Sequence, residues 1–62
     1  MDFKQRLLKE LGELNGRIYL LGKYIGERPE EETVLEQKQQ AIMMEYLRIL
    51  EARILNLMNK EG

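Results

Sequence analysis

The sequence predicts an all-α fold, namely an antiparallel two-helix hairpin that assembles with copies of itself into a homo-oligomeric helical bundle. Two long segments carry apolar residues at heptad spacing, and a short turn with the only proline separates them. The chain has 62 residues, which is too short to bury a large core alone. Because it has no Cys and no His, disulfides and ordinary zinc sites are excluded, and oligomerisation is the remaining source of stability.

The first helix is expected over about residues 3 to 25. Asp2 can cap its start, and Gly26 suits a C-terminal cap in the left-handed conformation. Its apolar residues recur at intervals of four and three and form one continuous stripe: Leu7, Leu11, Leu14, Ile18, Leu21 and Ile25.

Three glycines, Gly12, Gly16 and Gly22, interrupt this helix, and each costs about 1 kcal/mol relative to alanine. Gly12 and Gly16 fall on the side opposite the apolar stripe. Three explanations remain open: tolerated surface positions, close packing of a helix from another chain, or approach of a ligand to the backbone.

The turn is expected over residues 26 to 29 and the second helix over about residues 30 to 59. Pro29 favours this start, and Thr33 is the alternative start because T-V-L-E fits the capping pattern S/T-x-x-E. Two adjacent apolar stripes follow, and one hairpin contact needs only one of them, so we expect other chains to cover the second, together with Met44 and Met58. The first stripe is Met43, Leu47, Leu50, Ile54 and Leu57, and the second is Leu35, Ile42, Tyr46 and Ile49.

Charge is unevenly distributed although the net charge is -1. Residues 2 to 25 carry five basic and three acidic side chains (+2), residues 27 to 36 one basic and five acidic (-4), and residues 37 to 62 four basic and three acidic (+1). This field is too weak for duplex nucleic acid.

The sequence has no apolar run of about 20 residues and no basic start before an apolar stretch, so we expect neither a membrane span nor a secretory signal but a cytoplasmic protein.

The residue types point to binding rather than catalysis. The chain has no His, Cys or Ser, which excludes nucleophilic triads, and no cofactor or metal is expected. Tyr19 lies between Lys9 and Lys23 on the outer face of the first helix, where an aromatic ring can stack on a base while ammonium groups contact phosphate. The alternative is that these lysines are solvated surface charges. Two arginines, Arg48 and Arg53, remain as candidates in the second helix. Arg53 follows the second apolar stripe, where it would repeat around a symmetry axis and form an anion site, or would pair with a glutamate across an interface.

Two segments, RLLKELGELNGRIYLLGKYI and LEQKQQAIMMEYLRILEARI, together with the acidic turn between them, resemble a family of small phage-encoded hairpin proteins first noted in crAss-like phages. The resemblance covers about residues 6 to 54. The matching positions are Glu10, Glu13, Leu14, Arg17, Ile18, Leu21, Tyr24 and Ile25 in the first helix, and Gln39, Met43, Tyr46, Ile49, Leu50, Arg53 and Ile54 in the second.

The hairpin is similar, more distantly, to the phage anti-CBASS sponges. These are helical hairpins that assemble, typically as hexamers, and sequester cyclic di- and trinucleotide immune signals. KELGEL resembles the lysine-bearing first helix of the sponges and implies a phosphate contact at Lys9. Gln40, Met44 and Arg48 resemble a Q-x-x-x-M-x-x-x-R run in the second helix, so this resemblance favours Arg48 as the ligand-facing arginine, whereas the first favours Arg53.

These resemblances imply a phage anti-defence protein in the host cytosol. It would form a hexamer or another even-numbered homo-oligomer and bind a cyclic di- or trinucleotide between subunits through Lys9, Tyr19, Lys23 and Arg48 or Arg53. The alternative is an oligomeric interaction module that inhibits or scaffolds a host or phage protein through the second apolar stripe. A designed coiled-coil oligomer is a third interpretation, which the three helix glycines and the irregular polar face oppose.

Overall fold

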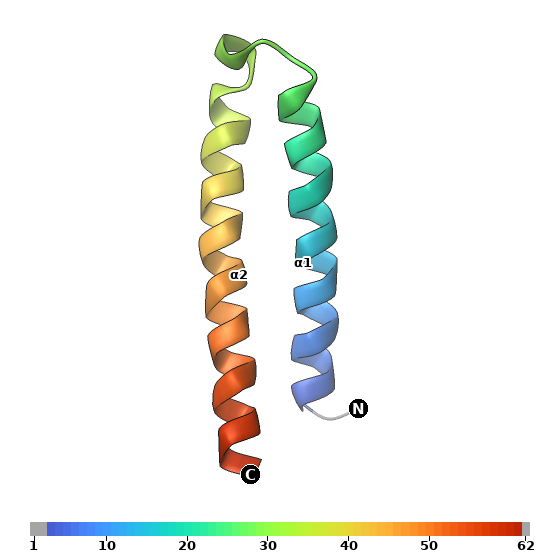
Figure 1. The fold of residues 1–62 in the computed structure, drawn as a ribbon, viewed down its shortest axis with the longest axis vertical. Coiled ribbons are helices and arrows are strands. Elements are labelled where there is room, and N and C mark those ends of the chain that lie inside the picture. Colours follow the sequence, from blue (N-terminus) through green and yellow to red (C-terminus); the bar gives the residue numbers. More distant parts are fainter. Residues whose placement is uncertain (1–2, 62) are drawn as a thin grey trace.

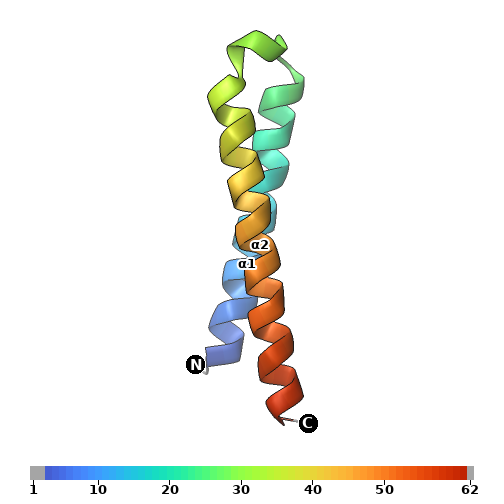
Figure 2. The same ribbon diagram turned by 90° about the vertical axis from the view of Figure 1, so that its left-hand side faces the viewer.

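The computed structural model describes residues 3–61, which form two long helices joined by a short turn (Figure 1). Helix α1 spans Phe3–Gly26, the short 3-10 helix η1 spans Glu30–Glu32, and helix α2 spans Val34–Glu61. Figure 2 shows from the side that α1 and α2 run past each other along the length of the hairpin. The described residues include no strand, so the prediction of an all-α hairpin is confirmed. The expected cap Asp2 lies outside the described residues.

The helices differ in length. α1 has 24 residues and α2 has 28, which correspond to about 36 Å and about 42 Å at the rise of an α-helix. The last turns of α2 therefore extend beyond the start of α1 (Figure 1). No helix among residues 3–61 is both long and apolar enough to cross a membrane.

A single line of side chains between the helices forms the core. Leu7 and Leu14 of α1 and Leu50 and Ile54 of α2 are buried, and Leu50 is 0% exposed. Five partly buried residues pack against them: Leu11, Ile18, Met43, Leu47 and Leu57. These positions all belong to the apolar stripe expected in the first helix and to the first of the two stripes expected in the second helix. Intervals of three and four residues keep such side chains on one side of a helix.

The second apolar stripe of α2 faces away from this core. Leu35, Ile42, Tyr46 and Ile49 are 75%, 67%, 40% and 57% exposed. Met44 and Met58 are also about half exposed, at 43% and 53%. The hairpin alone thus leaves this stripe uncovered, as expected from its width, and its coverage by other chains stays a prediction.

The start of the second helix differs from the expectation at residue 30. The three glutamates form the separate helix η1, and α2 begins at Val34. Thr33 is fully buried, and its carbonyl accepts the first bond of α2 from the Gln37 amide at 2.9 Å. The Thr33 hydroxyl donates to the Glu30 carbonyl at 3.3 Å and accepts from Gln37 Nε2 at 3.0 Å. Thr33, the alternative start, therefore directly precedes α2, and its carbonyl accepts the first bond of that helix.

The end of the first helix also differs from the expectation. Gly26 is the last residue of α1, and none of the described glycines has a positive φ, so the predicted left-handed cap is wrong. The chain instead leaves α1 through hydrogen bonds from the Glu27 amide to the Lys23 carbonyl at 3.1 Å and from the Arg28 amide to the Ile25 carbonyl at 3.3 Å. These bonds satisfy terminal carbonyls without a left-handed residue.

Candidate functional site

The outer face of α1 carries an exposed aromatic residue next to a cation. Tyr19 is 66% exposed, and Lys23 Nζ lies 5.8 Å from the centre of its ring. The two residues are one helical turn apart, which brings their side chains together on one face. The ring and the ammonium group thus offer a stacking surface and a positive charge at the same place.

The same face of α1 is open where its glycines lie. A Cβ atom added at Gly12 or Gly16 would meet none of the described atoms within 4 Å. Lys9 lies on this face before the glycines, about 15 Å along the helix axis from Tyr19. Within the hairpin, Lys9 is therefore not part of the Tyr19–Lys23 pair.

Gly22 has a different surrounding from the other two helix glycines. A Cβ atom at Gly22 would lie 3.0 Å from Nε2 of Gln40, a side chain of α2. The missing side chain thus makes room for Gln40 between the helices. This close approach was not recognised in the sequence, because it depends on the register between α1 and α2.

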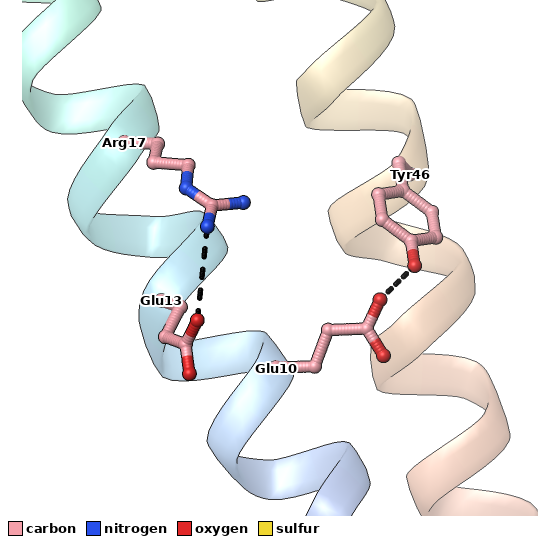
Figure 3. Close-up of polar contacts among 4 residues, drawn as sticks. All are labelled: Glu10, Glu13, Arg17 and Tyr46. Carbon is pink, nitrogen blue, oxygen red and sulfur yellow. Dashed lines mark hydrogen bonds and ion pairs between the residues drawn. The ribbon is translucent and has the colours of Figure 1, made fainter.

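A tyrosine–glutamate hydrogen bond links the helices on the flank that carries the second apolar stripe. The Tyr46 hydroxyl donates to Glu10 Oε2 across the two helices (Figure 3). The bond to Glu10 raises the pKa of Tyr46, and the nearby charge of Arg53 lowers it to a smaller extent. One sequence signal points to this pair: Glu10 and Tyr46 each directly precede a residue of the hairpin stripe, Leu11 and Leu47.

Charged residues of α1 surround this bond. Arg17 Nη2 lies 3.7 Å from Glu13 Oε2 in an exposed ion pair (Figure 3). Arg6, Lys9, Glu10 and Glu13 line a shallow open groove of about 400 Å³. Lys9 therefore lies among acidic as well as basic side chains, which makes this groove a mixed-charge surface.

The two candidate arginines of α2 point to different sides of the hairpin. Arg53 lies over the aromatic ring of Phe3, with Cζ 5.6 Å from the ring centre. Arg48 is exposed. It lies five residues before Arg53, a spacing that turns it about 140° away around the helix. The structure thus places Arg53 on the flank of Tyr46 and Arg48 on the outer side of α2.

A second open groove lies at the turn end of the hairpin. It has a volume of about 570 Å³. Arg28 stacks on Tyr24 beside it, with Cζ 3.6 Å from the ring centre, and its Nη1 donates to the Tyr24 carbonyl at 3.2 Å. Sequence reasoning missed this pair, because Arg28 lies in the turn after the end of α1 and its position depends on how the chain leaves that helix. The lining residues are Ile25, Gly26, Arg28, Glu30, Gln37 and Gln40.

The five predicted ligand residues do not converge within one hairpin. Tyr19 and Lys23 form a pair, whereas Lys9, Arg48 and Arg53 lie at separate places on the surface. No group of three or more His, Cys, Asp or Glu residues within residues 3–61 is arranged to hold a metal ion.

The chain is thus a small all-α hairpin, and its aromatic and basic candidate ligand-binding residues lie on exposed helix faces. A family model described as Sequestin matches residues 1–56, which is most of the chain. The chain belongs to the Sequestin family. No curated protein and no solved structure matches it.

Proposed function

We propose that this protein is a phage anti-defence protein that binds and sequesters a cyclic oligonucleotide immune signal between the subunits of a homo-oligomer. The observation that carries the proposal is the family match over residues 1–56, because the name Sequestin denotes sequestration. The ligand class rests on the resemblance to cyclic-nucleotide sponges and on the aromatic and basic residues of α1.

The Tyr19–Lys23 pair is the part of the proposed site that one hairpin supplies. The exposed ring of Tyr19 stacks on a base, and Lys23, at 5.8 Å from the ring centre, contacts a phosphate. Lys9 lies about 21 Å from Lys23 along the helix axis, which is too far to share one compact ligand in the same chain. Arg48, Arg53 or Lys9 of another subunit completes the site.

The exposed apolar surface supports the homo-oligomer. The hairpin buries four hydrophobic residues, Leu7, Leu14, Leu50 and Ile54, whereas the whole second stripe of α2 is exposed. A chain of this size with so small a core gains the missing burial from association. A hexamer or another even-numbered assembly is the proposed form.

The proposed activity needs no chemical step. Sequestration lowers the free concentration of the signal by binding alone, and the family name favours binding over catalysis. The cyclic ligand is therefore expected to leave the protein unchanged when the protein is denatured. Recovery of a linearised or hydrolysed nucleotide would contradict this part of the proposal.

Titration calorimetry of the protein with a panel of cyclic di- and trinucleotides tests the binding directly. We expect saturable heat with at least one of them, and an affinity loss of about 10- to 100-fold in Tyr19→Ala, because stacking on an aromatic residue contributes about 1–3 kcal/mol per base. Lys23→Ala is expected to weaken binding in a salt-dependent manner. Lys38→Ala, which removes an exposed lysine of α2, is the matched control. No heat with any nucleotide at micromolar protein would refute the proposal.

The exposed stripe also favours a second candidate function, an interaction module that inhibits or scaffolds a host or phage protein. Leu35 and Ile42 are 75% and 67% exposed, and apolar residues grouped in this way are typical of docking surfaces. This function predicts that the homo-oligomer gives way to a heteromeric complex. A pull-down that recovers one stoichiometric protein, without nucleotide binding in calorimetry, would favour it.

A further inference from the structure

The exposed apolar residues of α2 lie on a second heptad seam. Leu35, Ile42 and Ile49 recur every seven residues, and Gln39, Tyr46 and Arg53 fill the positions four residues after each of them. We call these six residues the second seam. Alternating intervals of four and three residues are the pattern by which one helix packs along another. The four apolar members are 40% to 75% exposed, so the hairpin itself does not use this pattern.

The polar group nearest the middle of the second seam is already satisfied. The Tyr46 hydroxyl donates to Glu10 Oε2 of the same chain and leaves the ring free to pack. A helix that covers the seam therefore encloses no unpaired hydroxyl, which would otherwise oppose association. The middle of the seam, at Ile42 and Tyr46, is thus suited to packing against another helix, and its polar members Gln39 and Arg53 lie toward the two ends.

The folding of the chain indicates what covers this seam. Four hydrophobic residues are buried in the part of the chain that the structure describes, too few for a stable domain of this size. The covering partner must consequently be present whenever the chain is folded. A second copy of the same chain is made together with the first, whereas a target protein need not be present when the chain folds.

The charge distribution indicates the orientation of the second copy. Residues 27 to 36 carry five acidic and one basic side chain (-4), and residues 48 to 60 carry three basic and one acidic (+2). Parallel packing of α2 on α2 would place like charges side by side, whereas antiparallel packing places the acidic turn, η1 and first turn of α2 of one chain beside the basic end of α2 of the other. The helix dipoles oppose each other favourably in the same arrangement.

We propose that a second copy packs on the second seam, α2 against α2 in antiparallel orientation, with the two-fold axis level with residue 44. This register stacks Ile42 on the partner's Tyr46 twice, on either side of the axis. Ile49 then packs beside the partner's Gln39. Knobs-into-holes packing of antiparallel helices alternates the two seam positions in this manner.

The same register explains the basic end of the seam. Arg53 comes to lie against the partner's Leu35, which receives the aliphatic part of the arginine. The guanidinium then lies near the acidic residues on either side of the partner's Thr33, namely Glu32 of η1 and Glu36 of α2. Charge-assisted contacts of this kind occur twice in the symmetric pair and disfavour the parallel alternative.

Cysteine cross-linking tests the orientation, since the chain has no cysteine of its own. A mixture of Gln39→Cys and Ile49→Cys proteins is expected to form the mixed disulfide under mild oxidation, because these positions face each other across the proposed interface. Each variant alone is expected to cross-link poorly. Efficient cross-linking of each variant alone, without enrichment of the mixed product, would overturn the proposal in favour of a parallel pair.

A pair of matched substitutions tests the surface itself. Ile42 and Leu55 are both exposed, at 67% and 58%, and they lie on different sides of α2. By light scattering, Ile42→Glu is expected to lower the native mass to about half or less, and Leu55→Glu to leave it unchanged. An unchanged mass for Ile42→Glu would overturn the proposal. If Ile42→Glu also loses helicity, the cross-linking result decides.

This inference rests on the homo-oligomer of the proposed function, but both measurements are made without nucleotide. A failed cross-link together with nucleotide binding would overturn the interface and leave the proposed function intact. A formed cross-link without binding of any cyclic nucleotide would support the interface and refute the ligand.

Discussion

The glycines of α1 yield a sharp prediction about stability. Gly12→Ala and Gly16→Ala each add one methyl group to the middle of a 24-residue helix. A Cβ atom at either position meets none of the described atoms within 4 Å. The substitution therefore costs nothing in the hairpin and removes the entropic penalty of glycine.

The expected gain follows from helix propensity. Replacing an interior glycine with alanine adds about 1 kcal/mol to the free energy of unfolding when no contact is disturbed. For a domain of this size, 1 kcal/mol raises the unfolding midpoint by about 4–8 °C. Gly22→Ala is the matched control: its Cβ atom lies 3.0 Å from Gln40 Nε2, so that side chain must move, and the gain is smaller.

Thermal unfolding followed by circular dichroism measures these shifts. The midpoint of an oligomer depends on protein concentration, so all variants are compared at the same chain concentration and without ligand. Titration calorimetry with a nucleotide bound by the wild-type protein then shows whether the new methyl groups obstruct the proposed ligand.

Opposite results would refute the reasoning. If Gly12→Ala or Gly16→Ala lowered the midpoint, a neighbouring chain would have to occupy the space that is empty in the hairpin. If both raised the midpoint but weakened nucleotide binding at least tenfold, the glycines would serve ligand approach. A gain in stability with unchanged binding would identify them as tolerated surface positions.

Three other predictions concern the core, the turn and the inter-helix hydrogen bond. Leu50→Ala removes most of a fully buried side chain and should lower the free energy of unfolding by about 2–5 kcal/mol, measured by urea denaturation. A decrease below about 1 kcal/mol would contradict the assigned core. Thr33→Val keeps the side-chain volume but removes the hydroxyl that bonds the Glu30 carbonyl. It should lower the free energy of unfolding by about 1 kcal/mol in the same assay, and an unchanged free energy would show that α2 starts at this position without the hydroxyl. The raised pKa of Tyr46 means that its bond to Glu10 stabilises the fold fully below the ordinary tyrosine pKa, about 10, and that this stability is lost as the pH rises through the raised pKa. The unfolding midpoint of the wild-type protein should therefore fall further than that of Tyr46→Phe as the pH rises above the ordinary tyrosine pKa, and parallel curves would exclude this contribution.

Heptad spacing predicted the helices and the core because it depends on local geometry alone. Any α-helix with apolar residues at intervals of three and four has one apolar side, and a short turn brings two such sides together. The helix ends were harder to predict, since Pro29 and Thr33 both offer valid start signals. The structure favours Thr33, where a buried hydroxyl bonds both Glu30 and Gln37.

The sequence predicted which residues belong to the candidate site but not where they lie relative to one another. Tyr19 and Lys23 are neighbours because they are one turn apart, which the sequence shows directly. The positions of Arg48 and Arg53 relative to them depend on which chain faces which, and a single hairpin does not contain that information. Their convergence remains part of the proposal.

The sequence by itself determined two helices, their shared apolar line and a surplus apolar stripe. The tertiary structure decided the contacts that depend on the register between α1 and α2. It placed Glu10 opposite Tyr46 and opened a space for Gln40 at Gly22. The physical reason is that periodicity specifies which side of a helix is apolar, whereas the axial offset of two helices is set by how their side chains interlock.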